Sequence, residues 1–148
     1  MTDYELIVTA LKIAREAHGA QKQKNGDEYV YHPITVALQC NSLKARIAGL
    51  LHDTIEDTFV TEDYLREQGI PEDILEAVSL LTCPINHPDP QQYLSYVSRL
   101  KDNPIAREVK IADLRNNLDV SRLPDPGAME YKHRHYYIPA LKMLTEDQ

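Results

Sequence analysis

An apolar run that ends in a cluster of polar side chains constrains this chain most. Residues 48–51, Ala-Gly-Leu-Leu, are followed directly by His52 and Asp53 and then by Glu56 and Asp57. Burying unpaired charge costs several kcal/mol, so a helix that carries these groups toward the interior needs a partner for them. A divalent metal ion is the simplest partner. The alternative interpretation is a solvated helix end that is rich in acidic residues.

The spacing of this cluster favours a metal site. On a continuous helix His52 and Glu56 lie one turn apart on one face, as do Asp53 and Asp57, so the four side chains can converge. Imidazole nitrogen together with carboxylate oxygen suits Mn, Fe or Zn better than Ca or Mg.

A second unusual aspartate stands in the predicted helix that follows Asn103-Pro104. Ile105, Val109 and Ala112 form its apolar stripe, and Asp113 continues that stripe. A buried carboxylate must be neutralised, and a metal ion held by another helix would neutralise it. A structural aspartate paired with a cation is the alternative.

The hydrophobic pattern predicts an all-α fold. Helical spacing recurs along the chain and the alternation typical of strands is nearly absent. The first helix is expected at about residues 3–18, a loop at 21–31, and a helix opening at Pro33 with His32 at its entrance. Pro139 is expected to kink the last helix. Helix caps are predicted at Thr2, Ser42, Thr61 and Asn103.

Composition narrows the possible classes of protein. The 148 residues predict a single domain, 1–148, and 43% hydrophobic with 26% charged residues is typical of a soluble globular protein. A net charge of −7 argues against binding to a nucleic acid polymer. Cys40 and Cys83 have no CxxC spacing and are expected to be reduced thiols. Without a signal-like segment or an 18-residue apolar stretch, we expect a cytoplasmic protein that does not span a membrane.

Taken in order, His32, His52-Asp53 and Asp113 reproduce a pattern of histidine, His-Asp pair and aspartate. With this pattern the sequence resembles the HD-domain phosphohydrolases. The runs at 17–24, 29–33, 50–58 and 109–113, with Asn117, look like the alarmone hydrolase domain of the Rel/Spo stringent-response enzymes and their small stand-alone relatives. The likeness covers about residues 4–123.

The resemblance implies an all-helical, compact HD-domain fold that binds one Mn²⁺. The metal ligands would be His32, His52, Asp53 and Asp113, and the paired acidic residues of the family fall on Glu56 and Asp57. The implied reaction removes the 3′-pyrophosphate from guanosine tetra- or pentaphosphate, a small phosphorylated nucleotide.

Substrate contacts are expected from two lysines and an asparagine. The family's nucleotide-contacting lysine and asparagine fall on Lys24 and Asn117, and Lys22 beside them would help to neutralise the phosphates. Lys110 and the basic run at 132–135 are further candidates for that task.

Three positions depart from the family pattern, each at a place that concerns base or phosphate recognition. Gln23 and Asp119 stand where the family favours arginine, and Leu114 stands where a basic residue is frequent. Two alternatives therefore stay open. One is another nucleotide phosphohydrolase, such as a nucleotidase or a 3′-phosphatase acting on a dinucleotide, and the other is a non-catalytic protein that senses a nucleotide.

Overall fold

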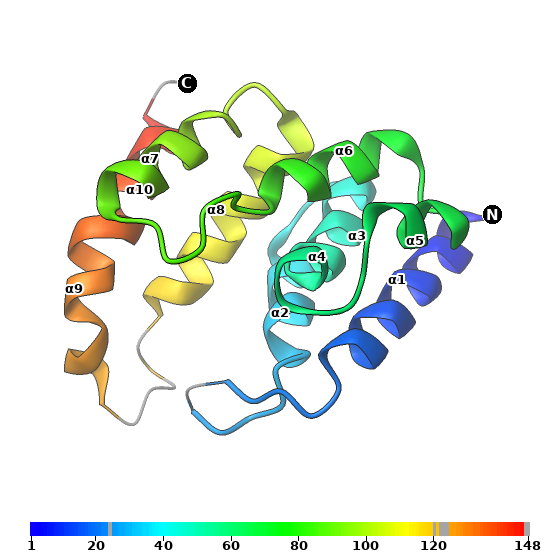
Figure 1. Ribbon diagram of the computed structural model, residues 1–148, viewed down its shortest axis with the longest axis horizontal. Helices are drawn as coiled ribbons and strands as arrows, with labels where there is room; N and C mark the ends of the chain where they lie inside the picture. The colour runs from blue at the N-terminus through cyan, green and yellow to red at the C-terminus, as the bar shows by residue number, and fades with distance from the viewer. Residues whose placement is uncertain (24, 120, 122–124, 147–148) are drawn as a thin grey trace.

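The computed structural model describes residues 1–23, 25–119, 121 and 125–146. Within these ranges the chain forms helices and no strand, apart from an isolated antiparallel bridge between Lys22 and Glu28. The predicted all-α class is confirmed (Figure 1). The elements are α1 (Asp3–His18), α2 (Tyr31–Gln39), α3 (Leu43–Leu51), α4 (Thr54–Asp57), α5 (Glu62–Glu67), α6 (Glu72–Leu81), α7 (Pro90–Ser98), α8 (Pro104–Leu118), η1 (Pro126–Met129), α9 (Glu130–Lys132), η2 (His133–Tyr137) and α10 (Ile138–Thr145).

The helix starts follow the local capping chemistry. The Thr2 hydroxyl accepts a hydrogen bond from the Glu5 amide at 3.1 Å, and Glu5 returns the contact, which completes a capping box. The caps predicted at Ser42, Thr61 and Asn103 also accept hydrogen bonds from amides of the first turn. These side chains satisfy donors that have no partner within the helix.

The helix predicted to continue through His52 to Asp57 is interrupted. Helix α3 ends at Leu51 and α4 begins at Thr54, with His52 and Asp53 between them. The Thr54 hydroxyl donates to the Leu51 carbonyl at 2.8 Å, and this local bond competes with the regular backbone pattern. The prediction of one continuous helix is therefore wrong, and the His-Asp pair lies at a corner of the chain.

Helix α2 begins earlier than predicted. It starts at Tyr31 instead of Pro33, so that His32 lies inside the first turn. Helices α2 and α3 then pack closely at Gly49, where an added Cβ would lie 3.3 Å from the Ala37 Cα atom. This packing brings the turn that bears His32 beside the corner that bears His52.

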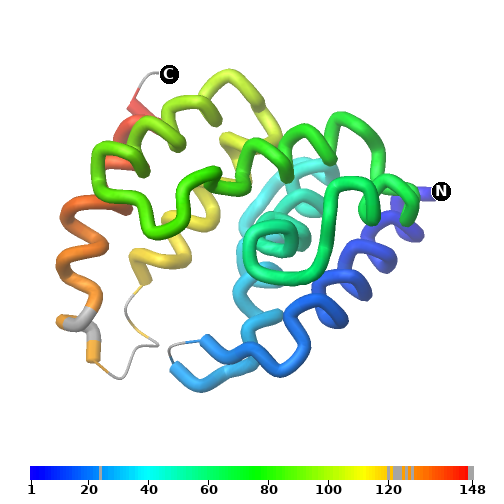
Figure 2. The backbone as a smooth tube through the Cα atoms, viewed as in Figure 1, coloured from blue at the N-terminus to red at the C-terminus, as the bar shows by residue number. Residues whose placement is uncertain are grey.

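Helix α8 runs through the middle of the molecule (Figure 1). It contacts α2, α3 and α6 on one side and α10 on the other. The backbone tube in Figure 2 shows α1 to α6 grouped on one side of α8, and α7 and the C-terminal helices on the other. The buried apolar core extends through both sides and includes Ile47, Leu51, Leu75, Leu114 and Leu144. Burial of each such side chain contributes roughly 1.5–3 kcal/mol.

The C-terminal helical segment is irregular where a kink was predicted. Residues His133–Tyr137 form a π-helix directly before Pro139 in α10. Because Pro139 has no amide hydrogen to donate, the His135 carbonyl four residues earlier cannot accept the usual α-helical hydrogen bond. Among the described residues, no helix has both the length and the apolar character needed to span a membrane.

Candidate metal centre and its cleft

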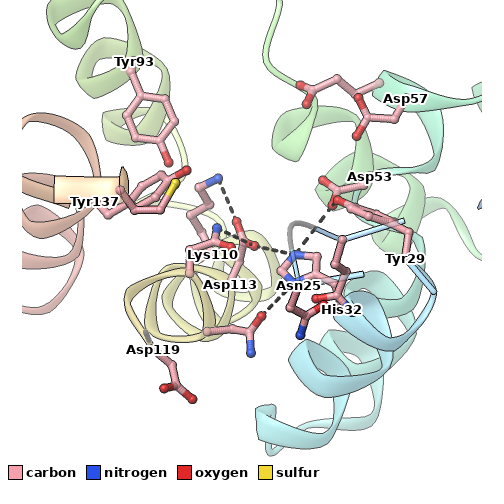
Figure 3. Close-up of a pocket in the computed structure, with 15 residues that line it drawn as sticks. Asn25, Tyr29, His32, Asp53, Asp57, Tyr93, Lys110, Asp113, Asp119 and Tyr137 are labelled. Carbon is pink, nitrogen blue, oxygen red and sulfur yellow. Dashed lines mark hydrogen bonds and ion pairs between the residues drawn. The ribbon is translucent and has the colours of Figure 1, made fainter. Parts of the chain in front are cut away.

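Three distant segments bring the four predicted ligand side chains together, and Figure 3 shows three of them, His32, Asp53 and Asp113. The Nε2 atom of His32 lies 3.0 Å from Asp113 Oδ1 and 3.7 Å from Asp53 Oδ2. The Nε2 atom of His52 lies 3.1 Å from Asp53 Oδ2 and 3.5 Å from Asp113 Oδ1. His32, His52 and Asp113 are buried, with 7%, 3% and 5% exposure. Helix α2, the α3–α4 corner and helix α8 thus each contribute to one small polar centre.

The hydrogen bonds of the two imidazoles determine which nitrogen carries the proton. His52 Nδ1 lies 2.6 Å from the Gly49 carbonyl, which can only accept, so Nδ1 is the donor. His32 Nδ1 lies 2.7 Å from Asn116 Oδ1 and is a donor in the same way. In each neutral ring the Nε2 atom then carries an unshared lone pair, and this lone pair faces carboxylate oxygens. Because lone pairs and carboxylates repel each other, this arrangement fits a bound cation.

The buried Nε2 of His52 supports the same conclusion, since it has no hydrogen-bond partner among the described residues. Burial alone would lower the pKa of His52, but Asp53 and Asp113 outweigh it and raise the pKa well above its usual value. The centre thus attracts positive charge, as a proton or as a metal ion. Two imidazole nitrogens and two carboxylates are a donor set typical of transition metals.

Neighbouring side chains hold these groups in place. The Tyr29 hydroxyl donates to Asp53 Oδ2 at 2.6 Å, and burial raises its pKa so that it stays protonated. Asn117 Nδ2 donates to Asp113 Oδ1 at 3.2 Å. Sequence reasoning gave no role to Tyr29 or Asn116. The available signals were that Asn116 precedes Asn117 and that Tyr29 lies three residues before His32.

The polar centre opens into a cleft of about 330 Å³. Asp53 and Asp57 lie on one wall in Figure 3, and Lys110, Tyr93 and Tyr137 lie on the other. The cleft therefore places acidic groups opposite a cation and two phenols, which is a suitable environment for a polar ligand.

Glu56 and Asp57 lie beside Asp53, although not on the continuous helix that was predicted. Acceptor oxygens of the three carboxylates lie within 4.8 Å of one another. Glu56 Oε1 accepts a hydrogen bond from the Cys83 amide at 2.8 Å. Burial raises the pKa of both Glu56 and Asp57, and the negative charge of Asp53 raises it further.

The predicted substrate-contacting residues do not all line the cleft. Asn117 lines the cleft, whereas Lys22 is exposed and is not among the described residues that line it. Lys24 lies outside the described residues. Of the departures from the family pattern, Gln23 and Asp119 line the cleft and Leu114 is part of the apolar core.

Comparison with known proteins places the chain in a family. The family model of the HD domain matches residues 8–120, which is most of the chain. The chain belongs to the HD domain family. Its histidine, His-Asp pair and aspartate all lie in the matched region.

Similar HD-domain sequences occur in much longer proteins. The chain is 44% identical over 68 residues to the guanosine-3′,5′-bis(diphosphate) 3′-pyrophosphohydrolase of Aquifex aeolicus, covering 43% of this chain and 10% of that protein. It is 30% identical over 142 residues to the GTP pyrophosphokinase of Streptomyces coelicolor, covering 86% of this chain and 16% of that protein. This HD-domain chain therefore corresponds to only a small part of these relatives.

A solved structure has the same fold. It is described as "A metazoan ortholog of SpoT hydrolyzes ppGpp and plays a role in starvation responses" and aligns with a TM-score of 0.78 and 21% identity. The alignment covers 96% of this chain and 84% of that chain. The shared fold therefore extends over nearly the whole molecule.

Proposed function

We propose that this HD-domain protein is a metal-dependent phosphohydrolase that removes the 3′-pyrophosphate from guanosine tetra- or pentaphosphate. The products would be pyrophosphate and GDP or GTP. The observation that carries the proposal is the buried centre, in which two imidazole lone pairs and two carboxylates face one another at the bottom of a cleft. Similarity to proteins named for this hydrolysis supports the choice of substrate.

His32, His52, Asp53 and Asp113 would hold the metal, and Mn²⁺ is our choice among the transition metals that suit this donor set. When bound, such an ion lowers the pKa of a coordinated water and polarises a phosphoryl oxygen. The Gly49 carbonyl and Asn116 keep the two imidazoles in the tautomer that a metal needs.

Glu56 and Asp57 are the groups that would accept the proton of the attacking water. Their raised pKa values suit this task because a base is more effective when its pKa approaches the working pH. Hydrolysis of the bond between phosphorus and the ribose 3′ oxygen then returns a hydroxyl to the ribose. Asn117 and the two lysines, Lys22 and Lys24, are the proposed substrate contacts.

The decisive experiment incubates the protein with guanosine tetraphosphate, with and without Mn²⁺, and measures pyrophosphate and orthophosphate separately. We expect Mn²⁺-dependent release of pyrophosphate. Glu56→Ala should keep its metal and lose about 10²-fold in turnover. Asp113→Ala should instead lose the metal, as elemental analysis would show. A metal-loaded Glu56→Ala variant with a normal rate would remove Glu56 from the mechanism.

A second candidate is a phosphohydrolase that acts on another nucleotide. The observation that favours it is the presence of Gln23 and Asp119 in the cleft lining, at positions where the Rel/Spo domains favour arginine. A panel of nucleotides assayed with Mn²⁺ separates the two candidates. Faster release of orthophosphate from a nucleotide without a 3′-pyrophosphate would support this second candidate. Tight binding without turnover would indicate a nucleotide sensor.

A further inference from the structure

Lys110 is a buried cation in the cleft that the proposed metal chemistry gives no role. Its side chain comes from α8, the residue is 8% exposed, and Nζ lies 3.0 Å from Asp113 Oδ2. The ring centroids of Tyr93 and Tyr96 lie 5.4 and 5.3 Å from the same nitrogen. Among the described residues that line the cleft, Lys110 is the only lysine or arginine. Burying an ammonium group is unfavourable unless the group is paired, so this arrangement calls for a specific role.

The two oxygens of Asp113 have different partners. Oδ1 faces His32 Nε2 at 3.0 Å and His52 Nε2 at 3.5 Å, on the side where the lone pairs converge. Oδ2 contacts the Lys110 ammonium instead. The ion pair with Lys110 therefore holds Asp113 Oδ2, which would otherwise be free to turn toward the imidazoles.

We propose that Lys110 is a positioning residue that restricts Asp113 to binding the metal through one oxygen. The inference rests on the metal site of the proposed function. A carboxylate can bind a cation through one oxygen or through both, and the second mode uses a coordination position that water or a phosphate oxygen needs. By holding Oδ2, Lys110 keeps that position available.

The side chains around Lys110 fit this role better than direct contact with substrate. Tyr93 and Tyr96 are both buried, and their ring faces stabilise the ammonium without removing it from the carboxylate. The ion pair links residues on adjacent turns of one helix, so its geometry is fixed by α8 itself.

The proposal predicts that loss of Lys110 lowers turnover without weakening metal binding. Without the lysine, Asp113 can offer both oxygens, and a nearby positive charge that repels the metal is lost. Lys110→Met should therefore bind Mn²⁺ as tightly as the original protein or more tightly, yet turn over at least about tenfold more slowly. A merely structural role would instead weaken metal binding and thermal stability together.

Water-proton relaxation tests the proposal without an activity assay, because bound Mn²⁺ relaxes water according to the number of exchangeable waters that it carries. We expect about one fewer exchangeable water per bound Mn²⁺ in Lys110→Met than in the original protein. Lys110→Arg keeps the charge beside Oδ2 and should restore the water number. Lys12→Met, which removes an exposed charge on α1, is the matched control.

Lys110→Gln guards against misfolding of the methionine variant, because its amide is uncharged but still polar. It should show the same loss of exchangeable water, and circular dichroism should show that it is folded in the absence of metal. Mn²⁺ binding with an unchanged water number in both neutral variants would overturn the role of Lys110. Failure of the original protein to bind Mn²⁺ would instead overturn the proposed function.

Discussion

At the scale of single residues, the proton positions of two imidazoles carry most of the functional argument. Gly49 and Asn116 each accept the Nδ1 hydrogen of one ring, which leaves both Nε2 lone pairs facing carboxylates. The His-Asp pair at 52–53 and the aspartate at 113 are visible in the sequence as polar residues where apolar ones are expected. Asn116 is not visible in that way, because only the folded chain brings it to His32.

Replacing Asn116 by alanine removes the acceptor for His32 Nδ1. The imidazole can then adopt the other tautomer or rotate, and partners of this kind affect metal affinity by about 10–100-fold. We expect Mn²⁺ to bind about 10-fold or more weakly in Asn116→Ala, as titration calorimetry would measure. Asn86→Ala, at an exposed loop position, is the control. Equal affinity in both variants would contradict the role given to Asn116.

The pH dependence of turnover should reflect Glu56. Burial raises the pKa of the Glu56 carboxyl above the ordinary 4.5, and the negative charges of Asp53 and Asp57 raise it further. A protonated carboxyl cannot accept a proton, so activity should fall as the pH drops through this raised pKa. We expect an acid limb in kcat/KM measured with saturating Mn²⁺, set by protonation of the Glu56 carboxyl.

Asp57→Asn removes one of the like charges that raise the Glu56 pKa. The acid limb of its residual activity should therefore move toward lower pH. An acid limb that stays in place would show that another group controls it.

At the scale of helices, local chemistry predicted the starts better than the interruptions. Capping at Thr2, Ser42 and Asn103 depends on neighbours within a few residues, and the structure confirms it. At the break after Leu51 the Thr54 hydroxyl donates to the Leu51 carbonyl. Helical periodicity in the sequence does not reveal this hydrogen bond. The early start of α2, which places His32 within its first turn, likewise has no side-chain cap that a sequence could show.

Gly49 permits the close approach of α2 and α3, and a methyl group there would meet backbone atoms of Ala37. Overpacking of this kind costs about 1–3 kcal/mol, whereas alanine gains about 1 kcal/mol over glycine within a helix. We expect Gly49→Ala to lower the free energy of unfolding by up to about 2 kcal/mol in urea denaturation. Metal affinity should fall as well, because His52 moves relative to His32. Unchanged stability and affinity would show that α2 yields without displacing the centre.

At the scale of the whole molecule, the centre joins segments that are far apart in the chain. His32 comes from α2, the pair at 52–53 from the α3–α4 corner and Asp113 from α8, and α8 contacts both groups of helices that surround it. The all-α class and the involvement of these four residues followed from the sequence. The cleft itself, with Tyr93 and Tyr137 on its far wall, did not, because their positions depend on how α7 and the π-helix pack against α8.

A ligand that binds only the folded chain stabilises it by about 2.7 kcal/mol at a concentration 100 times its Kd. For a chain of this length each kcal/mol raises Tm by about 2–4 °C. Saturating Mn²⁺ should therefore raise Tm by roughly 5–11 °C, and removal of the metal with EDTA should reverse the shift. Asp113→Ala is the control and should show little response. A Tm insensitive to Mn²⁺ in the original protein would argue against a metal that bridges these segments.

The order of the ligands along the chain also has a consequence for biosynthesis. Asp113 lies in α8, which is made after α2 and the α3–α4 corner, where the other three proposed ligands lie. A nascent polypeptide acquires its fourth donor only when α8 leaves the ribosomal exit tunnel. Partly synthesised chains thus lack one member of the proposed ligand set, so the complete proposed site forms only when α8 docks.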